Sequence, residues 1–229
     1  MRTLCLIPFF TWAVSVHCAN PISFSAKISP SEFNSTELQD VNIELVFENT
    51  SNSVITLYPG AARYTEEAGW LSPAFEVLIE KNKVLYPLIQ LRNYYGPPGM
   101  PPGEKYFEQM KIKIRPNEKY TYEIKSCFIP AKKLTKENLS LETLDPEGMD
   151  GLKRYKLSES SVLVFGLDCK KIKSLMHKVD FLSPGIFVPL KGAGSFDFKI
   201  KYTQKEWMSF KPEKYFELEA KGVSVFIGN

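Results

Sequence analysis

Apolar and polar residues alternate with a period of two along much of the chain, which is typical of β-strands that bury one face. The clearest stretch lies between Val41 and Phe47, where Ile43 and Leu45 complete the apolar face. The same alternation predicts further strands at 54–58, 75–79, 84–86, 110–114, 120–124, 196–202 and 223–227. Most of the chain is therefore expected to form sheet.

Clusters of turn-forming residues separate these strands. Residues 48–53 are expected to reverse the chain into the strand at 54–58. Residues 80–83 are expected to form a hairpin turn, and residues 115–118 a second one between the strands at 110–114 and 120–124. Strands joined by short turns pair in an antiparallel manner.

The alternation weakens between residues 128 and 190, where Pro130, Pro146, Pro184 and Pro189 interrupt it. Within this region only 167–179 has a helical spacing of apolar residues, with Asp168 at its start and lysines towards its end. We expect an irregular insertion, at about 128–190, that contains a short helix. The fold expected for 20–229 is a single mostly β domain, an antiparallel immunoglobulin-like β-sandwich.

Residues 1–19 have the layout of a secretory signal peptide, with Arg2 before an apolar stretch from Leu4 to Val16 and no acidic residue. Cleavage is expected after Cys18 or Ala19. A membrane anchor is the alternative, but the apolar stretch is shorter than the roughly 20 residues that span a bilayer. A bacterial lipoprotein signal is a second alternative. The chain is thus expected to be secreted or periplasmic, without a stable transmembrane span.

Removal of the signal leaves Cys127 and Cys169 in the mature chain. In an oxidising compartment an even pair of cysteines is most simply one disulfide, and two buried free thiols are the alternative.

Several segments follow one another in a familiar order: 22–28, 40–50, 75–85, Gly96-Pro97-Pro98, 114–120 and 194–202. In this order the chain resembles the non-catalytic β-sandwich that precedes the protease domain in deuterolysin-type (aspzincin) metalloendopeptidases, and that also occurs alone in secreted proteins. The resemblance implies an immunoglobulin-like fold and an accessory role. The protease half, with its His-Glu-x-x-His motif, is absent from the chain.

Residues for catalysis are scarce. The two histidines are His17, inside the predicted signal, and His177, which is expected on the surface. No catalytic residue, metal ligand or cofactor is therefore predicted. Four acidic residues lie close together in sequence and leave two alternatives, a carboxylate hydrolase or a calcium-dependent carbohydrate binder: Glu142, Asp145, Glu147 and Asp150.

The most unusual stretch is 94–103, Tyr-Tyr-Gly-Pro-Pro-Gly-Met-Pro-Pro-Gly, with Tyr106 and Phe107 shortly after it. Prolines hold a backbone extended, and aromatic side chains are enriched at binding sites. We predict Tyr94, Tyr95, Tyr106 and Phe107 as binding residues. A connection whose aromatic side chains fill the end of the sandwich is the alternative.

Charge and glycosylation motifs add little to this picture. The net charge of +3 is spread along the chain, which argues against a nucleic-acid partner. Asn34, Asn49 and Asn138 each begin an Asn-x-Ser/Thr motif and are acceptors only in a cell that glycosylates exported proteins.

The function expected from the sequence is a secreted or periplasmic, non-enzymatic binding or accessory domain. Its ligand is unknown, with a protein or a glycan as the candidate classes. A protease-inhibitor-like sandwich, in which the loop at 94–103 blocks a peptidase cleft, is the main alternative.

Overall fold

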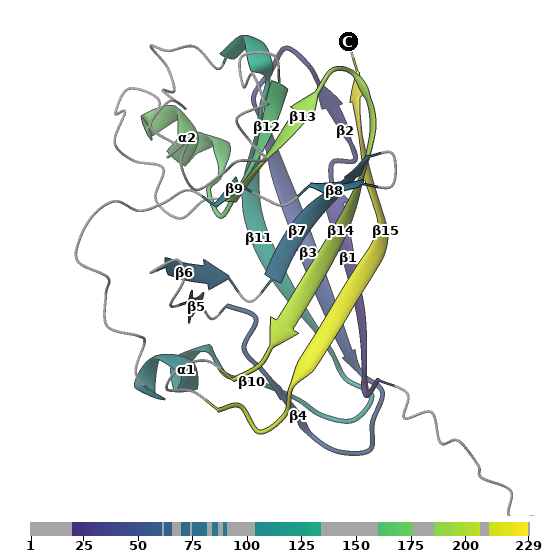
Figure 1. The fold of residues 1–229 in the computed structure, drawn as a ribbon, viewed down its shortest axis with the longest axis vertical. Helices are drawn as coiled ribbons and strands as arrows, with labels where there is room; N and C mark the ends of the chain where they lie inside the picture. The colour runs from purple at the N-terminus through teal and green to yellow at the C-terminus, as the bar shows by residue number, and fades with distance from the viewer. Residues whose placement is uncertain are drawn as a thin grey trace, which may run out of the picture.

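A computed structural model describes residues 20–60, 62–65, 70–73, 75–81, 84–86, 89–90, 104–133, 160–175, 186–206 and 211–228. Two main sheets lie one over the other (Figure 1). The six-stranded sheet has the order β1 (Ile22–Ser29), β3 (Gln39–Asn49), β11 (Lys119–Ile129), β12 (Ser160–Phe165), β13 (Ile186–Lys191) and β9 (Ile89–Gln90). The five-stranded sheet has the order β2 (Glu32–Asn34), β15 (Phe216–Gly228), β14 (Gly194–Gln204), β7 (Phe75–Lys81) and β8 (Val84–Tyr86).

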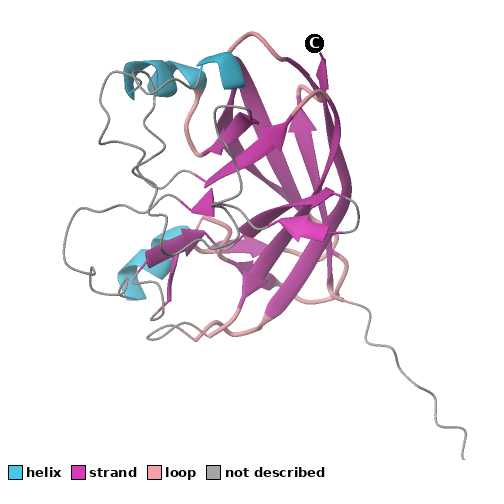
Figure 2. Cartoon of the chain, turned by 45° about the horizontal axis from the view of Figure 1, so that its top comes forward, coloured by secondary structure: helices cyan, strands magenta, loops and turns pink. Residues whose placement is uncertain are grey.

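Smaller elements cover one side and one end of this sandwich. Two pairs of short strands form separate two-stranded sheets, β4 (Ile55–Leu57) with β10 (Ile112–Ile114) and β5 (Ala62–Thr65) with β6 (Trp70–Pro73). The helices α1 (Glu104–Met110) and α2 (Cys169–Leu175) lie beside the strands (Figure 2), and η1 (Ala131–Lys133) is a single 3₁₀ turn. Within the part of the chain that the structure describes, no helix is long and apolar enough to cross a membrane.

The alternating side chains form the core between the sheets, as expected. In β3 the residues Val41, Ile43, Leu45 and Phe47 are all buried, and in β14 the same is true of every second residue from Phe196 to Tyr202. Burial of these side chains from both sheets is the main stabilising contribution of the fold. The prediction of a mostly β, antiparallel, immunoglobulin-like sandwich is confirmed.

The order of the strands matches the immunoglobulin pattern, in which the first strands pair in one sheet and the last strands in the other. β1, β3 and β11 are antiparallel neighbours, and so are β7, β14 and β15. The start of the chain serves both sheets, because β1 pairs with β3 whereas β2 pairs in parallel with β15. The cis peptide bond between Ser29 and Pro30 lies at the change of sheet.

One predicted hairpin is confirmed and two predicted pairings are wrong. β7 and β8 form the hairpin expected around residues 80–83. The turn at 115–118 also forms, with the N–H of Glu118 donating to the carbonyl of Arg115 and Asn117 at a φ of 60°. However, β10 before this turn pairs with β4, whereas β11 after it pairs with β3. Likewise, β3 and β4 flank the turn at 48–53 but do not pair with each other. The turns at 48–53 and 115–118 thus each connect the six-stranded sheet to the β4–β10 sheet, because alternation determines which face is buried but not which strand is the partner.

The region 128–190 is more regular than expected. β12 pairs with β11, and β13 pairs with β12, so both strands belong to the six-stranded sheet. All residues from Ser161 to Phe165 are buried, so this strand has no polar face and does not alternate. The expectation of an irregular insertion throughout this region was therefore wrong for these two strands.

Candidate functional site

The predicted aromatic binding residues are only partly described. Tyr94 and Tyr95 lie outside the described residues, and so does the side chain of Tyr106. Phe107 lies in α1, is 3% exposed, and packs edge-on against Tyr58 with ring centroids 6.5 Å apart. Phe107 thus holds α1 on the core, as in the structural alternative for this segment.

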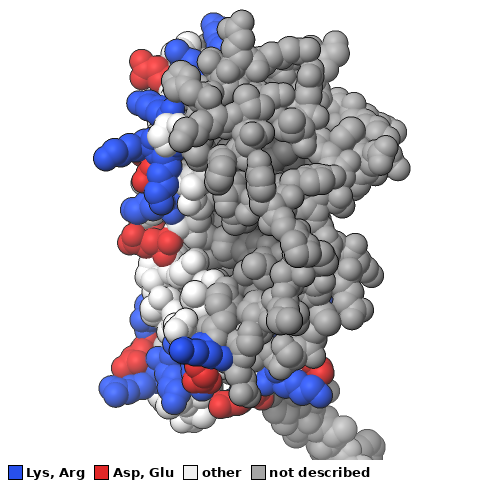
Figure 3. Space-filling view, turned by 90° about the vertical axis from the view of Figure 1, so that its left-hand side faces the viewer, with Lys and Arg blue, Asp and Glu red and all other residues white. Residues whose placement is uncertain are grey.

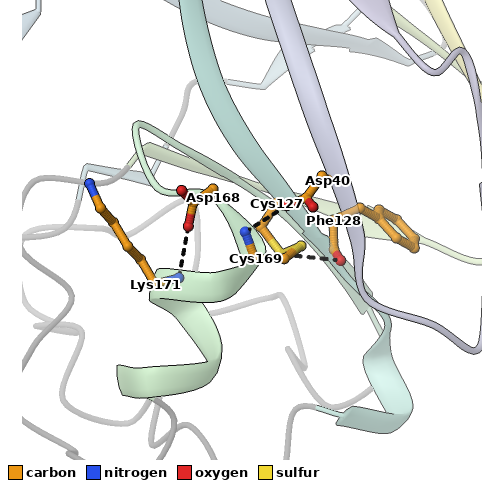
Figure 4. The surroundings of a disulfide bond; sticks show 6 residues. All are labelled: Asp40, Cys127, Phe128, Asp168, Cys169 and Lys171. Atoms are coloured by element: carbon orange, nitrogen blue, oxygen red, sulfur yellow. Dashed lines mark hydrogen bonds between the residues drawn. A yellow bond between two sulfur atoms is a disulfide. The ribbon is translucent and has the colours of Figure 1, made fainter.

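The predicted disulfide is present and joins β11 to the first residue of α2. The Sγ atoms of Cys127 and Cys169 are 2.03 Å apart, and both residues are buried (Figure 4). Cys127 alternates with the core residues Ser126 and Phe128, so its side chain points to the outer face of the six-stranded sheet. The disulfide therefore fixes α2 on that outer face.

Hydrogen bonds from backbone N–H groups to two aspartates fix the start of α2, where an aspartate was expected. Oδ1 of Asp168 accepts from the backbone N–H of Lys171 at 2.8 Å, which is an N-cap interaction. Oδ1 of Asp40, on β3, accepts from the N–H of Cys169 at 2.9 Å (Figure 4). One turn further along the helix, Ile172 is completely buried. Residues 176–179 of the predicted helix lie outside the described residues.

A cleft of about 380 Å³, here called the disulfide cleft, opens where α2 meets the sheet. Ser29, Asn42 and Lys125 are direct cross-strand neighbours on β1, β3 and β11, and their side chains share the outer face of the sheet. Among the described residues, these three strands and the start of α2 supply the lining: Ser29, Asp40, Val41, Asn42, Lys125, Ser126, Asp168 and Lys170. Polar side chains from four elements thus meet in one hollow.

Two polar atoms at this end of the sandwich have no hydrogen-bond partner, namely Oδ1 of Asn42 and Oγ of Ser126. Asn42 lies on the outer face, where its Nδ2 donates weakly to Glu44 at 3.5 Å. Ser126 pairs with the core residue Val41, so its hydroxyl points to the interior. Buried polar groups are normally paired, so each of these atoms is an energetic cost within the fold.

The opposite end of the sandwich contains polar groups that are fully paired. We call this region the β4–β10 end. Asn49 is 1% exposed, and its Nδ2 donates to the carbonyls of Ser53 and Ile114 at 2.7 and 2.9 Å. Its Oδ1 accepts from the N–H and the hydroxyl of Ser51. The side chain of Asn49 therefore has both of its donors and its acceptor in use.

A second paired network at the β4–β10 end is centred on Tyr202. Its hydroxyl donates to Oε1 of Gln204 at 2.6 Å and accepts from the N–H of Tyr58 at 3.1 Å. Nε2 of Gln204 donates to the carbonyls of Thr56 and Lys214. Burial raises the pKa of the Tyr202 hydroxyl well above its usual value.

A second hollow, of about 610 Å³, lies between β1 and β15, at the side of the sandwich where the change of sheet occurs. Its lining comes mostly from consecutive residues of one strand and its connection, 26–32, together with Gly222, Val223 and Ser224. Lys27 and Glu32 are the charged residues in this lining. Serine side chains supply the other polar groups of this lining, at positions 29, 31 and 224.

Two of the three glycosylation motifs can now be compared. Asn34 is exposed at the end of β2, and its Oδ1 accepts from the N–H and hydroxyl of Thr36. Asn49 is buried with both amide hydrogens donated, so the folded chain has no room for a glycan there. Asn138 lies outside the described residues, as do His177 and the acidic residues at 142–150.

Metal chemistry was not predicted, and the described ranges contain no group of three or more histidine, cysteine or acidic residues that could hold an ion. The carboxylates of the disulfide cleft, Asp40 and Asp168, each accept a hydrogen bond from a backbone N–H of α2. Their observed role is thus to position the helix.

The comparisons with known proteins give no family. No family model matches the chain, and no curated protein matches it. Among solved structures, a β-glucosidase from Listeria innocua in complex with glucose aligns with 91% of this chain at 12% identity and a TM-score of 0.26. A mutant of that enzyme in complex with laminaribiose gives the same values. The chain covers 16% of the enzyme's length, and a likeness at this TM-score carries no argument.

Proposed function

We propose that this chain is an exported, non-enzymatic β-sandwich domain that binds a ligand in the disulfide cleft. The observation that carries the proposal is the Cys127–Cys169 disulfide, which holds α2 against the sheet. The start of α2 therefore forms one wall of the cleft. Structural disulfides persist in oxidising compartments, which supports a location outside the cytoplasm. The expected signal peptide at 1–19 agrees with this location.

The elements that hold the lining residues of the cleft favour binding over catalysis. Three of its side chains lie on paired strands, and rigid elements hold binding groups more precisely than loops do. The two carboxylates in the lining already accept hydrogen bonds from the helix that they position. This arrangement suits a preformed recognition surface. The accessory role implied by the deuterolysin-type sandwich remains a prediction.

The test of binding without turnover is to incubate the oxidised chain with arrays of peptides and glycans and to analyse what it retains. We expect retained ligands to be recovered chemically intact by mass spectrometry. Asp40→Asn and Asp168→Asn are the informative variants. Release of cleaved products that stops in either variant would show an enzyme and refute the proposal.

Export is tested separately by expressing the full chain and sequencing the N-terminus of the mature protein. We expect it to begin at Ala19 or Asn20, with the two remaining cysteines resistant to alkylation until a reductant is added. A chain that stays in the cytoplasm with free thiols would contradict the proposed location.

A further inference from the structure

Folding brings together two lysine-rich segments that are far apart in the sequence. Cys127 lies shortly before η1, which contains Lys132 and Lys133. Cys169 begins α2, which contains Lys170, Lys171 and Lys173. The disulfide joins Cys127 to Cys169, a separation of 42 residues, and places η1 and α2 on either side of the bond (Figure 4). Five lysines from two distant parts of the sequence are therefore brought to the same side of the molecule as the disulfide.

These lysines are available to a ligand. All five are exposed, and none of their side chains has an ion pair or hydrogen bond within the described structure. Lys125, on the outer face of β11, is also exposed, and its ammonium group lies 3.7 Å from Glu123. Figure 3 shows basic side chains along the upper left margin of the face that it displays, with fewer acidic side chains between them.

The acidic residues nearby offset only part of this charge. Asp40 and Asp168 lie in the same region, and each has one carboxylate oxygen bonded to a backbone N–H. Among the described residues, six lysines therefore share this region with three carboxylates: Asp40 and Asp168, which have structural roles, and Glu123, which pairs with Lys125. Surface charges of one sign that lie within about 10 Å of one another act together on an approaching ion of the opposite sign.

The disulfide cleft lies within this group of lysines. Lys125 and Lys170 are part of its lining, together with the hydroxyl of Ser29 and the amide of Asn42. Its volume of about 380 Å³ is in the range of small-ligand sites. Asn42 brings a side-chain amide whose Oδ1 is buried and has no partner in the fold, so it can accept a hydrogen bond from a ligand once the side chain turns outwards. Ammonium groups beside neutral donors and acceptors suit a ligand that has both anionic and hydroxyl groups.

This combination favours an acidic glycan over other polyanions. A flat anionic bilayer would reach the protruding lysines but not the side chains inside a cleft. Duplex nucleic acid is commonly recognised through the bidentate contacts of arginine, whereas the cations of this surface are lysines. Sugar rings carry the hydroxyl groups that Ser29 and Asn42 can bond, and their sulfate or carboxylate groups can pair with lysine.

We infer that the disulfide cleft and the lysines of α2 and η1 form one binding surface for a linear acidic glycan. The inference rests on the proposed binding function and names its ligand class. One sugar unit occupies the cleft between Lys125 and Lys170. The chain of the glycan continues over the exposed lysines of α2 and η1.

The test is a titration of the oxidised full chain with three hexasaccharides, one sulfated, one carboxylated and one neutral, followed by calorimetry at low and at physiological salt. We expect at least one of the acidic sugars to bind, more weakly at the higher salt, and the neutral sugar not to bind. The triple variant Lys170→Gln, Lys171→Gln, Lys173→Gln should bind at least about tenfold more weakly.

A control triple variant removes the same charge elsewhere: Lys113→Gln, Lys205→Gln, Lys214→Gln, all exposed. It should bind within about twofold of the native chain, since its charges are separate from the cleft. Asn42→Ala should weaken the acidic hexasaccharide about threefold or more through the lost hydrogen bonds, while the salt dependence stays unchanged. Equal losses in both triple variants, or no effect of Asn42→Ala, would overturn the assigned surface.

Vesicles that contain phosphatidylserine test whether the lysines bind an anionic membrane surface instead of an acidic glycan. Binding to such vesicles without binding to any acidic hexasaccharide would overturn the inference in favour of a membrane surface. Failure of all three sugars, with a peptide retained in the array experiment, would refute the glycan and leave the proposed binding function intact. Cleavage of a bound sugar would refute the non-enzymatic function and leave the assigned surface intact.

Discussion

The two ends of the sandwich handle polar side chains in opposite ways. At the β4–β10 end, the side-chain donors and acceptor of Asn49 are all used inside the protein, and Tyr202 and Gln204 bond to each other and to backbone groups. At the disulfide cleft, Oδ1 of Asn42 has no partner and the lysines of α2 have no ion pair. The first arrangement stabilises the fold, and the second leaves capacity for a ligand.

This difference separates polar side chains that stabilise the fold from polar side chains that can bind a ligand. A buried group whose partners are all internal is expected to tolerate no substitution, because each change leaves a partner unpaired. A polar group without an internal hydrogen-bond partner can be substituted with little loss of stability. Its substitution is then expected to weaken ligand binding. Four predictions on stability follow from the comparison.

The largest effect is expected from removing the disulfide, which supports the cleft. The double variant Cys127→Ala, Cys169→Ala should lower the free energy of unfolding by about 4 kcal/mol, the loop-entropy value for this separation. Urea denaturation followed by circular dichroism measures the change. A loss below about 1 kcal/mol would show that the hydrogen bonds from α2 to Asp40 and Asp168 suffice to hold the helix.

Asn49→Ala should have the next largest effect, at the other end of the molecule. The variant leaves the carbonyl of Ile114 buried without its donor and removes three further hydrogen bonds. We expect a loss of about 3 kcal/mol in the free energy of unfolding. Asn34→Ala, at an exposed glycosylation motif, is the matched control and should change stability by less than about 0.5 kcal/mol. Similar losses in both would contradict the assigned role of Asn49.

Tyr202→Phe should lower the free energy of unfolding by about 2 kcal/mol at neutral pH, since it removes the hydroxyl that accepts from the N–H of Tyr58 and donates to Oε1 of Gln204. The variant also has a pH signature. Burial raises the pKa of the native hydroxyl above its ordinary value of 10.0, so above about pH 10 only the unfolded chain loses this proton. Stability contributed by Tyr202 is therefore complete below pH 10 and declines as pH rises.

At about pH 11 this ionisation should lower the stability of the native chain by about 1 kcal/mol more than that of Tyr202→Phe. The measurement is urea denaturation of both proteins at several pH values from 8 to about 11. Parallel curves for the two proteins would show that Tyr202 does not titrate differently in the folded and unfolded states.

The smallest effect, and the one of opposite sign, is expected for Ser126→Ala. Its hydroxyl is buried without a partner, so the substitution removes a desolvated polar atom and no hydrogen bond. The free energy of unfolding should rise by about 1 kcal/mol, as measured by urea denaturation. A decrease of similar size would show that this hydroxyl has a role in stability.

The sequence was sufficient for strands that alternate and insufficient for their partners. β3 and β14 could be predicted because one face of each is buried and the other is not. β12 was missed because every residue from Ser161 to Phe165 is buried, so no alternation of apolar and polar residues marks one of its faces. The pairing of β4 with β10 depends on how distant segments meet, which local alternation does not encode.

The disulfide could be predicted from the number of cysteines, but the cleft beside it could not. Its lining comes from three strands and a helix that only the fold brings together. One signal was present in the sequence. Lys125 and Cys127 are two residues apart in a strand and so share a face, and Lys170 follows the partner cysteine directly. A disulfide between these positions had to bring the lysines near one another.

The pairing of β2 has a mechanical consequence, because β2 runs parallel to β15. The N–H groups of Phe226 and Ser35 donate to the carbonyls of Ser31 and Gly228, so the two strands are bonded along their contact. If the segments before β1 and after β15 were pulled apart, the force would act along these parallel strands and load their hydrogen bonds together. The domain is thus built to resist tension along its strands more strongly than forces that peel one strand from its neighbour.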